Sequence, residues 1–114
     1  MTVIKDIEKF HDEMTIWRRD IHQHPELAFE EKRTSDFVAE KLKEFGIEIH
    51  RGLATTGVVG TIRNGEGPSI GLRADLDALP LEEKNTFEHV SVNPGIMHAC
   101  GHDGHTTMLL GAAK

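Results

Sequence analysis

This sequence is poor in several features, and each shortage excludes a class of protein. It has one cysteine, Cys100, so no internal disulfide can form, and this fits a reducing, cytoplasmic compartment. The apolar runs are too short for a membrane span, and the acidic residues near the start are unlike a signal peptide. With a formal net charge of −6 and no basic face, nucleic acid is not an expected partner. The 114 residues, 38% hydrophobic and 28% charged, predict a soluble globular protein with one modest core.

Apolar residues at helical spacing predict two helices in the first part of the chain. The first ends or changes direction at Pro25, and its single apolar stripe comprises Ile4, Ile7, Phe10, Met14, Trp17 and Ile21. The second covers residues 34–45, and Gly46 follows its end as a helix-terminating glycine. Its predicted buried face comprises Phe37, Val38, Leu42 and Phe45.

The pattern then changes to the alternation that is typical of strands. Ile47 and Ile49 alternate with polar residues, and residues 57–63 and 69–73 are two more β-rich runs. The dipeptide Asn64-Gly65 between these runs predicts a tight hairpin. Residues 81–95 have no clear period and predict a long loop. We therefore expect an α/β fold in which two helices pack on a sheet, with Asp75 and Asp77 at the end of a strand.

The helical pattern returns after Gly104 and continues to Lys114 without a capping glycine. An apolar helix with nothing after it would have little to pack against. We therefore expect residues 1–114 to be one portion of a larger α/β domain. The alternative is a small, complete α/β protein.

A histidine-rich run, Met97 to His105, concentrates metal-binding side chains. It holds three histidines, Cys100 and an aspartate, and imidazole and thiolate are preferred ligands of zinc and similar ions. In an extended strand end, Cys100 and His102 would point to the same side and could reach one metal pair. A helix starting near Gly104 would bring its positive end to the site. The alternative is a histidine-rich surface loop.

Two other clusters carry side chains that could serve a function. Asp75 and Asp77 follow an apolar run, where carboxylates can orient a ligand histidine or simply cap a turn, and spacing alone leaves both possibilities open. His22 and His24 lie at a helix end among positive neighbours. For that pair we favour a structural role, capping the helix and bonding the next loop, over metal binding.

Three runs together carry a family resemblance: RRDIHQHPELAFEE, GLRADLDALPLEE and NPGIMHACGHDGHTTMLLGAA. In this order they resemble the dinuclear metallohydrolases that include hippurate hydrolase, N-acyl-amino-acid amidohydrolases and the plant hydrolases of auxin–amino acid conjugates. Aminoacylases and zinc carboxypeptidases are distant relatives. The resemblance spans nearly the whole chain, and HACGHDGH is its most specific part.

The resemblance implies a fold and a set of roles. The fold is part of a three-layer α/β catalytic domain, without the family's separate dimerisation domain. Cys100 and His102 match two ligands of a two-metal centre that holds manganese, zinc or cobalt, and Asp77 matches the acidic residue that steadies a ligand histidine. Asp75 is not expected to be a ligand. In the proteins of this family, the other ligands, a glutamate and two histidines, follow the HACGHDGH run in sequence. Their general base, in a Glu-Glu pair, also follows it.

The implied reaction is metal-assisted hydrolysis of a small-molecule N-acyl amino acid to a carboxylic acid and an amino acid. With two of about five ligands, this chain alone is expected to be inactive. A homo-oligomer is possible. A hypothesis of another class is a non-catalytic module that binds a metal or another chain.

Overall fold

Of the two amino-terminal helices, only the second buries apolar side chains. The computed structural model describes Thr2 and residues 4–114. Helix α1 (Lys5–Glu8) is followed by α2 (His11–Gln23), which buries Trp17 and Ile21 and ends just before Pro25. The prediction of one continuous stripe is therefore wrong at its start: the chain turns between α1 and α2. Ile4 and Ile7 stay exposed, so no core contact holds the first turn in line with α2.

The second predicted helix is confirmed within two residues as α3 (Lys32–Glu44). It ends as the glycine predicts, because Gly46 adopts a positive φ of 76°. The Gly46 N–H donates to Lys43 O at 2.9 Å, and the Ile47 N–H donates to Leu42 O at 2.9 Å. This pair of hydrogen bonds closes the helix and directs the chain into the next strand.

The sheet differs from the one predicted. Strand β1 (Glu48–Leu53) pairs antiparallel with β2 (Gly57–Thr61), so the hairpin turns through residues 54–56 and not at Asn64-Gly65. The predicted strand at 69–73 is wrong, and with it the strand end at Asp75 and Asp77, since residues 62–78 lie outside any helix or strand. An Asn-Gly dipeptide specifies only a turn. Ile70 and Leu72 remain 87% and 68% exposed, so no burial draws this run onto β2.

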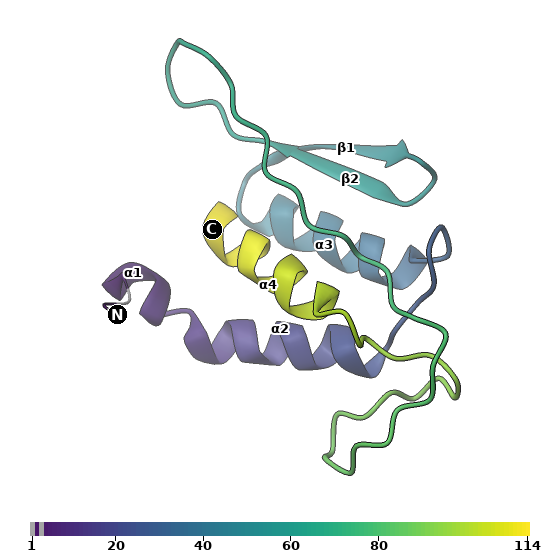
Figure 1. Cartoon of the computed structure of the whole chain (residues 1–114). Helices are drawn as coiled ribbons and strands as arrows, with labels where there is room; N and C mark the ends of the chain where they lie inside the picture. Colours follow the sequence, from purple (N-terminus) through teal and green to yellow (C-terminus); the bar gives the residue numbers. More distant parts are fainter. Residues whose placement is uncertain (1, 3) are drawn as a thin grey trace.

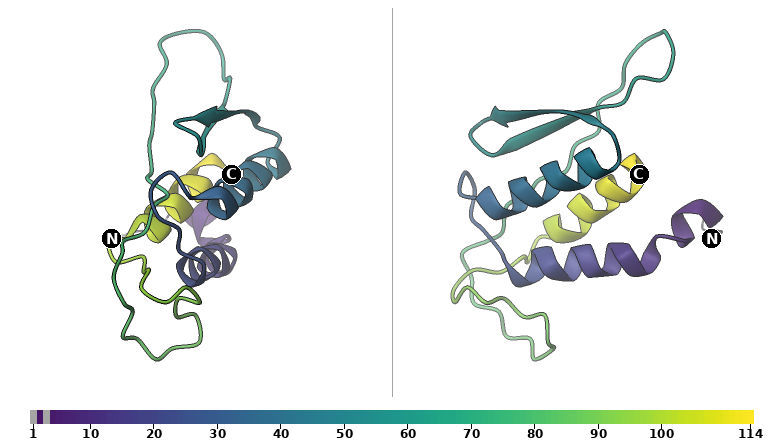
Figure 2. Two further views of the ribbon diagram at one scale, coloured as in Figure 1. Left: turned by 90° about the vertical axis from the view of Figure 1, so that its right-hand side faces the viewer. Right: turned by 180° about the vertical axis from the view of Figure 1, so that it is seen from behind.

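The elements stack in layers (Figure 1; Figure 2). Helix α4 (His102–Ala113) lies between α2 and α3, and the β1–β2 hairpin covers the other side of α3. The prediction that two helices pack on the sheet is thus correct for α3 only, because α2 packs mainly on α4. The small core between the layers comprises Trp17, Val38, Leu42 and Leu110.

Two long connections cross these layers. Residues 62–78 run past α3 and α4, and the predicted loop at 81–95 is confirmed as irregular chain (Figure 1). The two connections meet at a bridge between Leu79 and Met97, and the Ala78 N–H donates to Glu26 O at 2.8 Å. A cavity of about 980 Å³ lies between α3, β2, α4 and residues 70–77. None of the helices within the described residues has the length and apolar character needed to cross a bilayer.

Candidate metal centre

His102 is held at the start of α4 by Asp77, which belongs to the connection of residues 62–78. Its Nδ1 lies 2.9 Å from Asp77 O and 3.0 Å from Asp77 Oδ1, and its side chain is 16% exposed. Both partners of Nδ1 are acceptors, so Nδ1 carries a hydrogen and donates it. In a neutral ring, the lone pair is then on Nε2, the nitrogen that is left to bind a metal.

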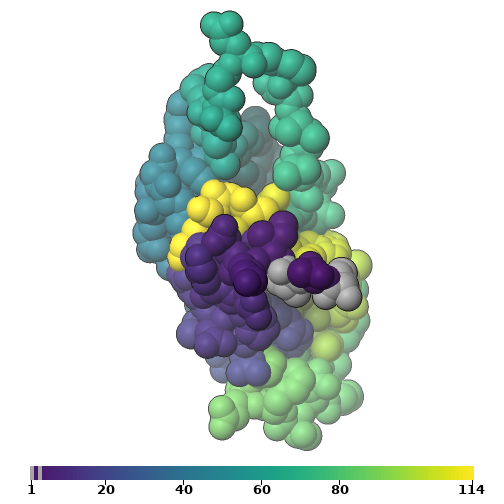
Figure 3. Space-filling model, turned by 90° about the vertical axis from the view of Figure 1, so that its left-hand side faces the viewer, coloured from purple at the N-terminus to yellow at the C-terminus, as the bar shows by residue number. Residues whose placement is uncertain are grey.

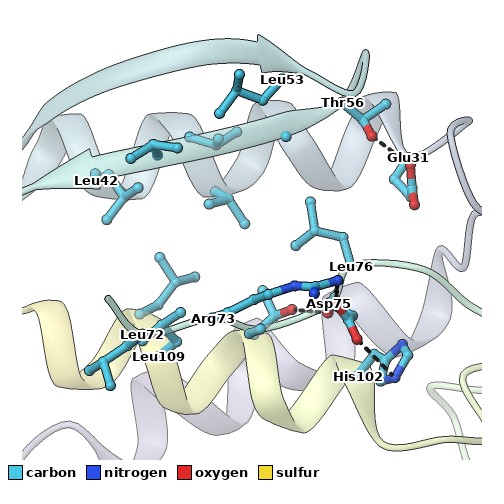
Figure 4. Close-up of a pocket in the computed structure, with 18 of the residues that line it drawn as sticks. Glu31, Leu42, Leu53, Thr56, Leu72, Arg73, Asp75, Leu76, His102 and Leu109 are labelled. Carbon is cyan, nitrogen blue, oxygen red and sulfur yellow. Dashed lines mark hydrogen bonds and ion pairs between the residues drawn. The ribbon is translucent and has the colours of Figure 1, made fainter. Parts of the chain in front are cut away.

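Asp75 lies on the Nε2 side of the same ring. Its Oδ2 is 3.9 Å from His102 Nε2, too far for a hydrogen bond, while its Oδ1 accepts from Arg73 Nη2 at 2.5 Å (Figure 4). Thr106 on α4 donates to the Asp75 backbone oxygen at 3.0 Å. Residues 75–77 are therefore tied to the first two turns of α4, although they do not end a strand.

Cys100 lies two residues before His102 and is a free, exposed thiol. The predicted extended geometry is wrong here, because Gly101 between them adopts a left-handed φ of 89° and α4 begins at His102, within two residues of the predicted start near Gly104. The backbone therefore turns sharply between the two side chains. Whether Cys100 and His102 share a metal stays a prediction.

The donors present suit part of a metal site. A thiolate and an imidazole nitrogen fit zinc and similar ions, and a carboxylate that fixes the histidine tautomer is the usual support of such a ligand. Within Thr2 and residues 4–114, however, no group of three or more histidine, cysteine, aspartate or glutamate side chains is arranged to hold an ion. The residues present therefore fit a metal only as one side of a larger centre.

The structure also brings together a buried network that sequence reasoning missed. His22 on α2 lies between Asp103, 2.8 Å from its Nδ1, and Glu83, 2.5 Å from its Nε2. The predicted structural role of His22 and His24 fits these contacts, since His24 Nδ1 also donates to Asp20 O at 2.8 Å. No local signal could have paired His22 with residues 61 and 81 positions away.

The network changes the ionisation of its members. Burial works to raise the pKa of Asp103, but hydrogen bonds from His22 and from the Gly104 N–H hold that pKa below its ordinary value. Burial lowers the pKa of the neighbouring His98, which favours its neutral form. Among the described residues, neither ring nitrogen of buried His98 has a hydrogen-bond partner.

Comparison with known proteins finds a family likeness. Residues 71–114 match the profile of Peptidase family M20/M25/M40. The chain is 50% identical to an N-acyl-L-amino acid amidohydrolase of Geobacillus stearothermophilus over 95% of its own length, and 50% identical to a hippurate hydrolase of Campylobacter jejuni over its full length. It covers 30% of each of those proteins, so it spans less than a third of their length.

Two solved structures have the same fold as this chain over nearly its whole length. The chain superposes with a TM-score of 0.88 and 44% identity on the YxeP protein of Bacillus subtilis, described as a dinuclear metal-binding peptidase of the M20 family. The match covers 93% of this chain and 30% of YxeP. A structure from methicillin-resistant Staphylococcus aureus gives a TM-score of 0.91 at 38% identity, covering 96% and 28% of the two chains. These matches confirm the predicted family resemblance and α/β fold class.

Proposed function

We propose that this chain, which is related to Peptidase family M20/M25/M40, is the amino-terminal portion of the catalytic domain of a metal-dependent amidohydrolase. The proposed reaction is hydrolysis of the amide bond of an N-acyl amino acid, such as hippurate, to a carboxylic acid and an amino acid. The names of the Geobacillus and Campylobacter relatives support this substrate class. The structural observation that carries the proposal is the His102 ring, whose Nδ1 is held by Asp77 and whose Nε2 is left for a metal.

In this proposal, Cys100 and His102 are two of the protein ligands of a centre for two divalent ions, manganese, zinc or cobalt. The ions would supply polarisation of the scissile carbonyl and acidification of a water. Asp77 keeps the hydrogen on His102 Nδ1 and makes Nε2 a better donor of electrons. The remaining ligands and the general base would come from a part of the protein that this chain does not include.

The proposed compartment is the cytoplasm. Cys100 is exposed and free, and a thiol that is to bind a metal must stay reduced. A reducing compartment meets that requirement.

A second candidate function is a module that binds another chain. Large apolar side chains are exposed around the cavity, among them Ile62, Ile70 and Leu72. A contiguous apolar surface of this kind favours contact with another protein surface.

The ligand assignment is tested by titrating the purified chain with Co²⁺, whose bond to a thiolate gives a charge-transfer absorption band. We expect the band with the wild-type chain and none with Cys100→Ala. His102→Ala should keep the fold and weaken Co²⁺ binding by about tenfold or more. His50→Ala, at an exposed histidine of β1, is the matched control and should bind as the wild type does. Equal binding by all four proteins would contradict the assignment.

A further inference from the structure

His22 occupies the junction of three parts of the chain. It lies in the last turn of α2, and Asp103 is the second residue of α4. Glu83 belongs to the loop of residues 81–97, part of which forms the light-green mass beneath the purple amino-terminal helices in Figure 3. The side chains of His22, Asp103 and Glu83 are each at most 4% exposed. The junction therefore joins three segments that are distant in sequence, and the side chains that form it are buried from solvent.

The contacts of the ring specify how many hydrogens it carries. Nδ1 faces Asp103 Oδ2 at 2.8 Å and Nε2 faces Glu83 Oε1 at 2.5 Å. A neutral imidazole has one N–H, and an ionised carboxylate can only accept. With both carboxylates ionised, the ring can therefore donate to Asp103 and to Glu83 at the same time only if both of its nitrogens carry a hydrogen.

The charges around the ring agree with a cationic His22. Arg18 Nε lies 3.2 Å from Asp103 Oδ2, so the cluster contains two carboxylates and one guanidinium before His22 is counted. A charged His22 makes the cluster neutral, and a neutral one leaves a buried negative charge without a partner, which is costly. His89 and His98 also face the ring, at centroid distances of 5.8 and 6.4 Å. Burial lowers the pKa of each, which favours their neutral forms.

The two carboxylates that His22 joins each anchor a different segment. Asp103 directly follows His102 at the start of α4. Glu83 Oε2 accepts the Ser91 N–H at 3.1 Å and so ties together the two sides of the loop. The same loop is joined to the end of α2 by the Val92 N–H, which donates to Gln23 O at 2.9 Å.

We propose that His22 is a positioning residue of the metal centre: with a hydrogen on each ring nitrogen it joins Asp103 to Glu83, and so fixes the first turn of α4, with His102, against the loop of residues 81–97. This inference rests on the metal centre proposed above. A residue that only filled space at this position would need the volume of the ring but not its two donors.

Histidine ring NMR of the metal-free wild-type chain tests the two donors. We expect both His22 ring nitrogens to show the chemical shifts of protonated nitrogens at pH 7.5. A neutral His22 ring at that pH would overturn the proposal. This measurement needs neither a variant nor a metal.

Two variants separate the two donors. His22→Asn keeps an amide donor near the Nδ1 position, toward Asp103, and His22→Gln keeps one near the Nε2 position, toward Glu83. We expect His22→Asn to speed exchange of the Ser91 amide hydrogen by tenfold or more and to leave His102 in place. We expect His22→Gln to protect Ser91 better and to disturb the His102 Nδ1 hydrogen bond to Asp77. His24→Asn, at the next histidine of the same helix end, is the matched control and should change neither signal.

Co²⁺ titration of the same proteins then separates the two proposals. His22→Gln should bind more weakly than His22→Asn, by about tenfold. If the wild type binds no Co²⁺, the proposed metal centre fails, but the NMR signals still decide whether His22 positions α4. If Ser91 exchange and the His102 signal are unchanged in both variants, the positioning role is wrong even when the wild type binds metal.

Discussion

The hydrogen bond between His102 and Asp77 is the contact on which the candidate site depends at the scale of single residues. It is supported twice, because both the side-chain oxygen and the backbone oxygen of Asp77 accept from Nδ1. The backbone contact means that loss of the carboxylate charge alone should not release the ring. It should instead weaken the electronic support of Nε2.

Asp77→Asn tests this support. We expect the variant to fold normally and to bind Co²⁺ about tenfold more weakly, at the low end of the ~10–100-fold range for such supporting residues, because the backbone oxygen still orients the ring. Asp75→Asn is the matched control. Its carboxylate is 3.9 Å from Nε2 and paired with Arg73, so its loss should matter less. A larger effect at Asp75 than at Asp77 would transfer the supporting role to Asp75.

At the scale of elements, the turn before α4 decides where His102 points. Gly101 adopts a φ of 89°, a conformation that side chains with a Cβ rarely accept, and α4 begins at the next residue. The nearest atoms to a Cβ at this position belong to His105, at 3.7 Å, which is ordinary contact. The cost of a substitution at Gly101 therefore comes from the backbone and not from crowding.

Gly101→Ala should destabilise the chain by about 1–2 kcal/mol, the cost of a left-handed conformation for a residue with a Cβ. Thermal unfolding followed by circular dichroism measures it. Gly104→Ala is the matched control, since Gly104 lies inside α4 and a methyl group there would meet no atom within 4 Å outside its own helix backbone. Alanine also favours helix over glycine by up to about 1 kcal/mol. Equal melting temperatures for the two variants would show that a side chain does not strain the turn before α4.

At the scale of the whole molecule, the cavity between α3, β2 and α4 has an open, apolar side. Ile70 and Leu72 are 87% and 68% exposed, and among the described residues 63–77 no backbone group bonds to another backbone group. Unpaired backbone and exposed apolar side chains on one segment are the features of a strand edge without its neighbour. This surface is the basis of the second candidate function.

We expect this chain alone to hydrolyse hippurate negligibly with manganese, zinc or cobalt present. Its described residues include no group of three or more metal-binding side chains arranged around one point. The proposed general base would lie outside this chain, and the loss of such a base costs ~10²–10⁴-fold by itself. Release of free glycine is the assay, with the Campylobacter hippurate hydrolase as the positive control. Metal-dependent turnover near that of the control would contradict the expectation. Light scattering of the same sample would show self-association if the apolar surface binds a second copy.

The local signals in the sequence were sufficient for most of the helical residues, though not for the break between α1 and α2, and for the types of residue at the site. Periodicity and Gly46 predicted α3, and the histidine-rich run predicted where donor side chains lie along the chain. The strands were predicted less well, since β1 and β2 pair across residues 54–56 and the run at 69–73 pairs with neither. Strand pairing depends on which neighbours are present to bury each face, and an isolated sequence pattern does not contain that information.

By itself, the sequence determined most of the helical segments, the glycine that ends α3, and the presence of thiol, imidazole and carboxylate groups in three short runs. Only the tertiary structure decided which of these groups meet. Asp77 reaches His102 across 25 residues, and His22 reaches Glu83 and Asp103 across 61 and 81. The physical reason is range: a helix or turn forms from hydrogen bonds between close neighbours in sequence, whereas contacts between distant side chains depend on how whole elements pack against one another.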